Sequence, residues 1–289
     1  MIVVFNPTAG RRRAQLLWRV LDVMVANGMR LELVKTTQPR HAEALARCAA
    51  EAGARMIVAA GGDGTIAEVA SGLLGSDAKL GVIPLGTANV LAHELALPFT
   101  PQAVAAALAF GRTRRIWPGV MVSPEGSRLF VQMLGVGFDA QVVHHLSPRL
   151  KRVCGRAAYV LQTLRELPRY RFDPIRVKVD EKEYQASSVV LTKGCLYAGQ
   201  YRLALDAHPS EPGFSVVLFQ RAGAGAAMVY GAALPLNMLP HTTGICRVRA
   251  LKVEIRSVRQ MPAQADGDAA GFAPLTVTDA PVPIPIVIG

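Results

Sequence analysis

The sequence has few cysteines and few aromatic residues, and these shortages exclude several kinds of protein. Four of the 289 residues are cysteine, and they lie far apart, without a Cys-x-x-Cys pair or a histidine at metal-ligand spacing. A zinc site is therefore not expected, and a reducing, cytosolic compartment is favoured over an oxidising one. Apolar residues make up 51% of the chain and charged residues 18%, which is typical of a globular protein and not of a disordered one.

Long uninterrupted apolar segments are also missing. The apolar start at residues 1–5 is too short for the core of a signal peptide, and its arginines follow the apolar run instead of preceding it. Residues 222–239 approach the length of a membrane span, but they contain Gly223, Gly225, Gly231, Pro235 and Asn237. Such residues are typical of a packed helix and its approach, so no membrane-spanning segment is predicted.

Acidic residues are scarcer than basic ones, and the imbalance is concentrated in one stretch. The formal charge is +11, and residues 149–176 hold eight basic and two acidic residues, eight minus two giving +6. Apolar residues recur there at helical spacing, so a basic amphipathic helix is predicted at about 149–167. The pattern favours an anionic membrane surface as a partner, and an ordinary solvated surface helix is the alternative. Few aromatic residues interleave the basic ones, so no nucleic-acid partner is predicted.

The first part of the chain alternates strand and helix patterns. Apolar runs at 2–5, 31–34, 56–60 and 80–83 are separated by helical patterns at about 14–28, 41–52 and 65–74, and further helices are expected at about 88–95 and 101–110. Strands separated by helices of this length predict an α/β domain with a doubly wound parallel sheet. We assign this domain to residues 1–118.

The rest of the chain, residues 119–289, is predicted to be β-rich. Short strand-like runs, including one at 248–255, are punctuated by turn signals and interrupted by helical patterns at about 150–167 and 226–239. This pattern of short strands and turns indicates an antiparallel β-sandwich or barrel. Proline stands at every second position from 281 to 285. Prolines that all face one way remove hydrogen-bond donors from one side of a strand, so an edge strand is predicted there.

A glycine-rich loop follows the third predicted strand of the first domain. Residues 61–65 read Gly-Gly-Asp-Gly-Thr and lead directly into a helical pattern. Backbone N–H groups at a helix N-terminus, together with the helix dipole, bind phosphate, and missing Cβ atoms allow its close approach. The carboxylate of Asp63 would repel a bare phosphate, so its presence suggests a divalent ion nearby. A tight turn with Asp63 as a helix cap is the plainer alternative.

Two more loops end strands of the same predicted sheet. One, at residues 5–10, reads Phe-Asn-Pro-Thr-Ala-Gly, and the other, at residues 84–89, reads Pro-Leu-Gly-Thr-Ala-Asn. Ligands of doubly wound sheets bind outside the carboxyl ends of the strands, so both loops are expected to converge on residues 61–65. Asn6 would be a turn former, and Thr87 and Asn89 helix caps, if no ligand bound there.

Taken in order along the chain, these motifs resemble those of the diacylglycerol kinase catalytic-domain family, and most closely its bacterial lipid kinases, which are similar to sphingosine and ceramide kinases. The resemblance continues through residues 135–140, Gly-Val-Gly-Phe-Asp-Ala, to residues 265–268, Ala-Asp-Gly-Asp. It implies a nucleotide-binding α/β domain and a β-rich domain for the lipid substrate, with the active site in the cleft between them.

The resemblance also implies roles for individual residues. The positions that match the family's nucleotide-binding residues, or lie in the strand-end loops beside them, are Asn6, Pro7, Gly10, Thr36, Gly61, Gly62, Asp63, Gly64, Thr65, Ile66, Ala67, Thr87 and Asn89. Asp268 stands where the family usually has a glutamate as general base. A carboxylate that accepts the proton of the substrate hydroxyl is what phosphoryl transfer requires, although aspartate is one methylene shorter than glutamate.

Two positions depart from the family's pattern. An aspartate that often joins a metal-linked acidic network is replaced here by Val90, which leaves Asp63 and Asp139 as candidate metal ligands. The Asp-Gly turn that the family associates with a structural magnesium corresponds to Pro212-Gly213, and a proline side chain cannot bind a metal. That structural site is therefore expected to be altered or lost.

The sequence thus predicts a kinase that uses ATP and Mg²⁺ to phosphorylate a lipid hydroxyl, with a diacylglycerol-like or sphingoid acceptor. It would act in the cytoplasm, peripherally attached to the inner face of the membrane. A soluble-substrate kinase of the NAD kinase type and a catalytically weak module that binds lipid or nucleotide are the alternatives. The oligomeric state is left open, a homodimer being one option.

Overall fold

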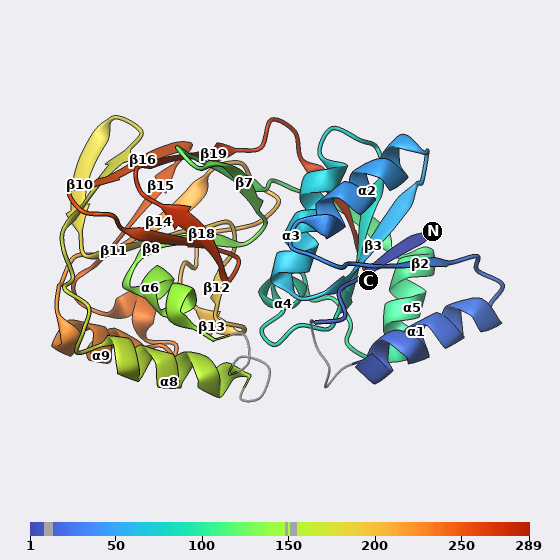
Figure 1. The fold of residues 1–289 in the computed structure, drawn as a ribbon, viewed down its shortest axis with the longest axis horizontal. Coiled ribbons are helices and arrows are strands. Elements are labelled where there is room, and N and C mark those ends of the chain that lie inside the picture. Colours follow the sequence, from blue (N-terminus) through green and yellow to red (C-terminus); the bar gives the residue numbers. More distant parts are fainter. Residues whose placement is uncertain (9–13, 148–149, 151–154) are drawn as a thin grey trace. The chain divides into compact units, whose positions relative to one another are not determined.

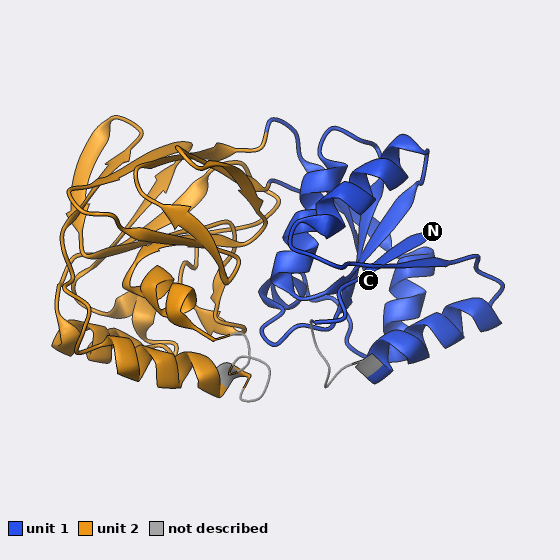
Figure 2. Ribbon diagram, viewed as in Figure 1, with its two compact units in different colours: residues 1–117, 281–289 blue, residues 118–280 orange. Residues whose placement is uncertain are grey.

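The computed structural model describes residues 1–8, 14–147, 150 and 155–289, and the chain forms two compact units. Unit 1 consists of residues 1–117 and 281–289, and unit 2 of residues 118–280 (Figures 1 and 2). The sequence placed residues 281–289 in the second domain. That placement is wrong, because the last strand pairs with strands of unit 1.

Unit 1 is built on one six-stranded sheet with the order β2-β1-β3-β4-β20-β5. The neighbouring pairs from β2 to β20 are parallel, and β5 alone runs antiparallel to its neighbour. The strands are β1 (Ile2–Phe5), β2 (Glu32–Lys35), β3 (Met56–Gly61), β4 (Lys79–Pro84), β5 (Arg112–Ile116) and β20 (Ile284–Ile288).

Helices cover both faces of this sheet (Figure 1). They are α1 (Ala14–Ala26), α2 (His41–Glu51), α3 (Asp63–Leu73), α4 (Val90–Glu94) and α5 (Pro101–Phe110). Leu17 of α1 and Leu108 of α5 are buried against Val58 of β3 in one cluster. On α3, Gly72 lies so close to α2 that a Cβ would stand 2.3 Å from Glu43 O. The predicted doubly wound parallel sheet is confirmed.

The proline-rich C-terminal segment is not the edge strand that was predicted. Pro281 and Pro283 precede β20, and only Pro285 lies within it. The strand is interior, between β4 and β5. Its register with β4 is limited to the single pair Ile286 and Leu80. Because the ladder on that side is so short, a proline next to it costs few hydrogen bonds.

Unit 2 is a sandwich of two antiparallel six-stranded sheets with the orders β10-β9-β16-β19-β6-β7 and β15-β14-β11-β8-β17-β18. The strands are β6 (Gly119–Ser123), β7 (Gly126–Phe130), β8 (Met133–Gly137), β9 (Ile175–Val179), β10 (Lys182–Ala186), β11 (Ser188–Thr192), β14 (Phe214–Phe219), β15 (Ile245–Ala250), β16 (Lys252–Ser257), β17 (Pro262–Ala265), β18 (Asp268–Phe272) and β19 (Leu275–Asp279), with a small pair β12 (Leu196–Tyr197) and β13 (Tyr201–Arg202). Buried side chains from both sheets, such as Val177 and Val216, form one core.

The apolar run at 248–255 was predicted as one strand but belongs to two. β15 ends at Ala250 in one sheet, and β16 begins at Lys252 in the other. Between them the backbone N–H groups of Leu251 and Lys252 donate to Oδ1 of Asp180, at 3.1 and 2.9 Å. The distant carboxylate therefore fixes the point at which the chain changes sheets.

The helices of unit 2 are α6 (Phe138–His145), α8 (Arg156–Glu166) and α9 (Ala224–Ala233), followed by a short 3₁₀ turn at Leu239–His241. The predicted basic helix corresponds to α8, and residues 149 and 151–154 of that prediction lie outside the described residues. Throughout the described part of the chain, no helix has both the length and the apolar character needed to cross a membrane.

Candidate active site

The end of β1 meets the glycine-rich loop through Asn6. The backbone N–H of Asn6 donates to Ala60 O, and its side-chain amide donates to the hydroxyl of Thr65, both at 3.1 Å. Its Oδ1 accepts hydrogen bonds from the N–H and the hydroxyl of Thr8, at 3.0 and 2.7 Å. These bonds fix the orientation of the Asn6 amide and join two loops that are 59 residues apart.

The loop at residues 84–89 contacts the glycine-rich loop through backbone atoms. A Cβ on Gly86 would lie 2.5 Å from the Cα of Gly62, and a Cβ on Gly61 would lie 2.4 Å from the Thr65 hydroxyl. The N–H groups of Leu85 and Gly86 both donate to Gly61 O, at 2.9 and 3.2 Å. Gly62 has φ −96°, so close packing, and not a left-handed turn, is what requires glycine here. The predicted convergence of the three loops is confirmed.

Helix α3 begins directly behind this junction. Its first helical hydrogen bond runs from the N–H of Ile66 to Gly62 O at 3.0 Å. The N–H groups at residues 63–65 therefore belong to the first turn, where the helix dipole places partial positive charge. Ile66 and Ala67 are buried in the core, so only their backbone can face the loop. This local geometry suits a bound phosphate.

Asp63 holds a neighbouring helix in place. Its Oδ1 accepts a hydrogen bond of 3.2 Å from the N–H of Leu91 in the first turn of α4. Val90, which precedes Leu91, is 5% exposed. The side chain of Asp63 thus caps α4, whereas the N-cap residue of α3 is Gly62.

The remaining predicted nucleotide-binding residues differ in their placement. Asn89 is fully buried with φ 49°, and its side-chain amide donates to Gly86 O at 2.9 Å, so it shapes the loop from within. Thr36 donates its N–H to Phe5 O at 2.9 Å. Pro7 and Thr87 are exposed. Gly10 lies outside the described residues.

Glu68 is a residue of this site that the sequence did not suggest. It lies on α3, and its carboxylate accepts hydrogen bonds from the N–H groups of Arg40 and Ala42, at 3.0 and 3.2 Å. It thereby caps α2 and holds the segment that follows Thr36 against α3. The two contacts span 28 and 26 residues, a separation that no local pattern reveals.

The candidate catalytic turn lies in unit 2, between β17 and β18. Asp266 and Gly267 have φ 49° and 81° and connect the paired residues Ala265 and Asp268, as in a two-residue hairpin turn. The carboxylate of Asp266 accepts the N–H groups of Val131, Gln132 and Met133 at 2.7 to 2.9 Å. It ties the turn to the connection between β7 and β8.

Asp268 is the exposed acid of this turn. Its side chain is 49% exposed, and Oδ2 lies 3.9 Å from Nη2 of Arg128, which also donates from Nη1 to Ala269 O at 2.6 Å. The two acids thus differ: the carboxylate of Asp266 holds the backbone of residues 131–133, and that of Asp268 is half exposed.

Asp139 is partly buried, and both of its carboxylate oxygens accept hydrogen bonds. Its Oδ1 accepts the hydroxyl of Tyr197 at 2.5 Å, and its Oδ2 accepts the amide of Gln264 at 2.9 Å. Burial raises the pKa of Asp139, against the lowering effect of these two hydrogen bonds. Oε1 of Gln264 in turn accepts the N–H of Gly267 at 2.9 Å, so the network reaches the candidate catalytic turn.

This arrangement does not favour Asp139 as a metal ligand, because both oxygens are already bound by neutral donors. Among the residues that the structure describes, no group of three His, Cys, Asp or Glu side chains could hold a metal ion. Asp63 remains a candidate to assist an ion that arrives with a nucleotide, since Mg²⁺ on phosphates needs only one or two protein carboxylates.

Comparison with known proteins agrees with this geometry. The family model of the diacylglycerol kinase catalytic domain matches residues 1–121, and that of the YegS C-terminal NAD kinase beta sandwich-like domain matches residues 132–288. A diacylglycerol kinase from Staphylococcus carnosus (strain TM300) is 27% identical over 278 residues, which cover 94% of this chain and 89% of the relative. One from Bacillus subtilis (strain 168) is 26% identical over 277 residues, which cover 94% and 90%.

Solved structures share the fold. A Bacillus anthracis str. Sterne protein assigned to the diacylglycerol kinases superposes with a TM-score of 0.80 at 17% sequence identity, over 100% of this chain and 94% of that one. At this identity the likeness shows the fold alone. Together, the two family matches and the relatives that span the chain show that it belongs to the diacylglycerol kinase catalytic-domain family, which consists of phosphotransferases with an alcohol group as acceptor.

Proposed function

We propose that this protein is a lipid kinase that transfers the γ-phosphoryl group of ATP, bound with Mg²⁺, to a lipid hydroxyl. The observation that carries the proposal is the junction of the three strand-end loops at the start of α3, held by the Asn6–Thr65 hydrogen bond and the Gly62–Gly86 contact. The curated relatives that span the chain are named diacylglycerol kinase, which supports a diacylglycerol-like acceptor. A sphingoid acceptor is the alternative.

Each group in the proposed reaction has a defined task. Backbone N–H groups at residues 63–65 would bind the phosphates, and the bound Mg²⁺ would neutralise their charge. Asp268 would accept the proton of the lipid hydroxyl as the oxygen attacks the γ-phosphorus. The bond from this phosphorus to the bridging oxygen would break, and ADP would leave with the electron pair.

Two helices of unit 2 support a membrane as the place of reaction. On α8, Val160 and Leu164 are 62% and 60% exposed, and on α9, Met228 and Val229 are each 56% exposed. Helix α9 has no buried residue at all. The exposed arginines 165, 169 and 171 stand on or just after α8. Exposed apolar side chains beside arginines suit the headgroup region of an anionic leaflet, and we propose peripheral attachment to the inner face of the membrane.

Transfer of radiolabelled phosphate from ATP to diacylglycerol in mixed micelles tests the function. The expected result is a labelled lipid that forms only when Mg²⁺ is present. Failure to label any lipid from a total extract would contradict the proposal. The soluble-substrate alternative predicts activity without added lipid or detergent, and the module without catalysis predicts ATP binding without any transfer.

A further inference from the structure

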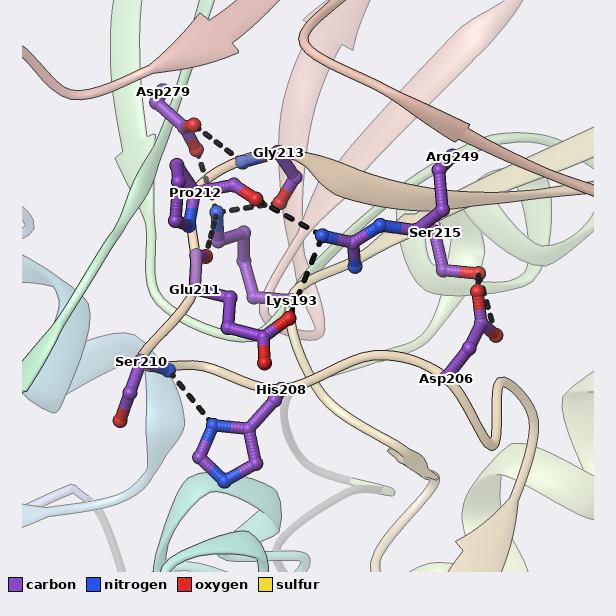
Figure 3. Close-up of polar contacts among 10 residues, drawn as sticks. All are labelled: Lys193, Asp206, His208, Ser210, Glu211, Pro212, Gly213, Ser215, Arg249 and Asp279. Atoms are coloured by element: carbon purple, nitrogen blue, oxygen red, sulfur yellow. Dashed lines mark hydrogen bonds and ion pairs between the residues drawn. The ribbon is translucent and has the colours of Figure 1, made fainter.

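Unit 2 contains a buried ammonium group that the proposed reaction does not use. Lys193 follows β11, and its side chain is 0% exposed. Nζ donates to Gly213 O at 2.7 Å, to Glu211 O at 3.3 Å and to Oδ1 of Asp279 at 2.6 Å (Figure 3). It also lies 4.6 Å from the centroid of the Phe214 ring, whose face attracts a cation.

The hydrogen-bond acceptors around Nζ of Lys193 indicate its protonation state. A protonated lysine has three N–H donors, and a neutral amine has two and a lone pair. Nζ of Lys193 has three oxygen acceptors, two of them main-chain carbonyls and one a carboxylate. Burial lowers the pKa of Lys193 below its ordinary value, and the hydrogen bond and the charge of Asp279 offset only part of this effect. The three acceptors match the three N–H donors of the protonated form.

Carbonyl and carboxylate oxygens are also the ligands that Mg²⁺ and Ca²⁺ prefer. The turn at Pro212-Gly213 is where the family resemblance implies a structural magnesium, which would need several such oxygens as ligands. Proline offers no side-chain ligand at 212. Asp279 uses Oδ1 for Lys193 and accepts the N–H of Gly213 with Oδ2 at 2.5 Å. Both oxygens of this carboxylate are therefore occupied.

The other acids near the turn have other partners. The carboxylate of Glu211 is 61% exposed and lies 3.8 Å from Arg249. Asp206 accepts the hydroxyl of Ser215 at 3.3 and 3.4 Å. Figure 3 shows both side chains turned away from the ammonium of Lys193. The residues present do not fit a divalent cation at this turn.

We propose that the ammonium of Lys193 is an internal cation that replaces a structural divalent ion at the 211–213 turn. The turn, β11 and β19 are then held together by a covalently attached charge. It follows that unit 2 keeps its structure without metal, and that any Mg²⁺ requirement of the protein comes from the nucleotide. This inference does not depend on the identity of the acceptor lipid or on catalysis.

Thermal unfolding of the nucleotide-free protein tests the proposal. We expect the same Tm in Mg²⁺ and in EDTA. We expect Lys193→Met to lower Tm by about 10 °C, because it leaves Asp279 and two carbonyls without their cation. Lys252→Met is the matched control. That lysine is exposed and pairs with Glu254 at 2.8 Å, so its loss should shift Tm by no more than about 1 °C.

A second experiment tests the proposal even if Lys193→Met fails to fold. Crystals of the parent protein soaked in Mn²⁺ without nucleotide should show no anomalous scattering at residues 211–213 or Asp279. The double variant Lys193→Ser, Pro212→Asp supplies a carboxylate and removes the ammonium, and its Tm should rise with added Mn²⁺. A manganese ion at this turn in the parent protein, or a parent Tm that falls in EDTA, would overturn the proposal.

Discussion

The side-chain amide of Asn6 donates a 3.1 Å hydrogen bond to the hydroxyl of Thr65, and this bond joins the loop after β1 to the first turn of α3. Both groups lie where the proposed triphosphate would bind. The bond spans 59 residues, so it forms only when β1 and β3 are paired in the sheet. The proposed phosphate site is therefore a product of sheet assembly as well as of the glycine-rich loop.

Removing either partner of this bond should weaken nucleotide binding. We expect Asn6→Ala and Thr65→Val each to reduce ATP affinity about fivefold, since a hydrogen bond contributes about 1 kcal/mol. The double variant should lose little more than either single one, because the two residues act as a pair. Calorimetric titration measures this, with Asn27→Ala as control, whose side-chain amide donates to Val23 O on α1 at 2.7 Å. Fully additive losses would contradict the pairing.

Adding a methyl group at the contact between Gly62 and Gly86 should destabilise the fold. Gly86→Ala would place a Cβ 2.5 Å from the Cα of Gly62 and 2.7 Å from Oδ1 of Asn89. We expect a loss of about 1–3 kcal/mol in the free energy of unfolding, as for other overpacked sites, together with loss of ATP binding. Gly231→Ala on α9 is the control, because a Cβ there meets nothing within 4 Å. Chemical denaturation that found both variants equally stable would exclude the close contact.

The two acids of the catalytic turn should have opposite phenotypes. Asp268→Asn should lower kcat by about 10²- to 10⁴-fold, as loss of a general base does, and leave Tm unchanged. Asp266→Asn should lower the stability by about 1–3 kcal/mol, because three backbone N–H groups lose their shared carboxylate. Steady-state kinetics and thermal unfolding of both variants separate the roles. Normal turnover by Asp268→Asn would remove it from the mechanism.

The burial of Asp139 should make the stability depend on pH. Its pKa in the folded chain is raised above 3.8 by burial, so the folded state binds this proton more tightly than the unfolded state. The contribution to stability is then complete below pH 3.8 and falls as the pH rises through the folded pKa. Asp139→Asn lacks this titration. We expect the Tm of the variant relative to the parent to increase with pH over that interval, and a difference that is constant with pH would contradict the assignment.

The apolar face of α8 should matter only at a lipid surface. Replacing Val160 and Leu164 together by serine should lower binding to vesicles that contain anionic phospholipid about tenfold or more, since each buried side chain contributes about 1 kcal/mol or more. ATP affinity should not change. The control is Val258→Ser, because Val258 is 92% exposed in the same unit. Equal vesicle binding by both variants in sedimentation assays would argue against this surface.

Much of the fold could be predicted because its signals are local. The alternation of apolar runs and helical patterns predicted the parallel sheet of unit 1, and strand β1 and helix α5 have the predicted bounds. The wrong predictions concern strands whose position in a sheet depends on a partner strand far away in the sequence. The run at 248–255 divides between two sheets at Leu251, and the proline-rich C-terminal segment enters the interior of a sheet to which the sequence did not assign it.

The same difference between local and distant signals applies to the residues of the candidate site. Asn6 and residues 61–65 could be found because strand-end loops with glycine and polar residues carry their chemistry in the sequence itself. Glu68, Tyr197 and Gln264 could not, because their partners lie 26 residues or more away, and isolated glutamate, tyrosine and glutamine residues have no distinguishing pattern.

By itself the sequence determined which segments form strands and helices and which loops can bind phosphate, because residue spacing and glycine content act over a few neighbouring positions. Only the tertiary structure decided the state of individual charged groups. Asp139 became a partly buried acceptor and Lys193 an internal cation because their hydrogen-bond partners come from segments far apart in the chain.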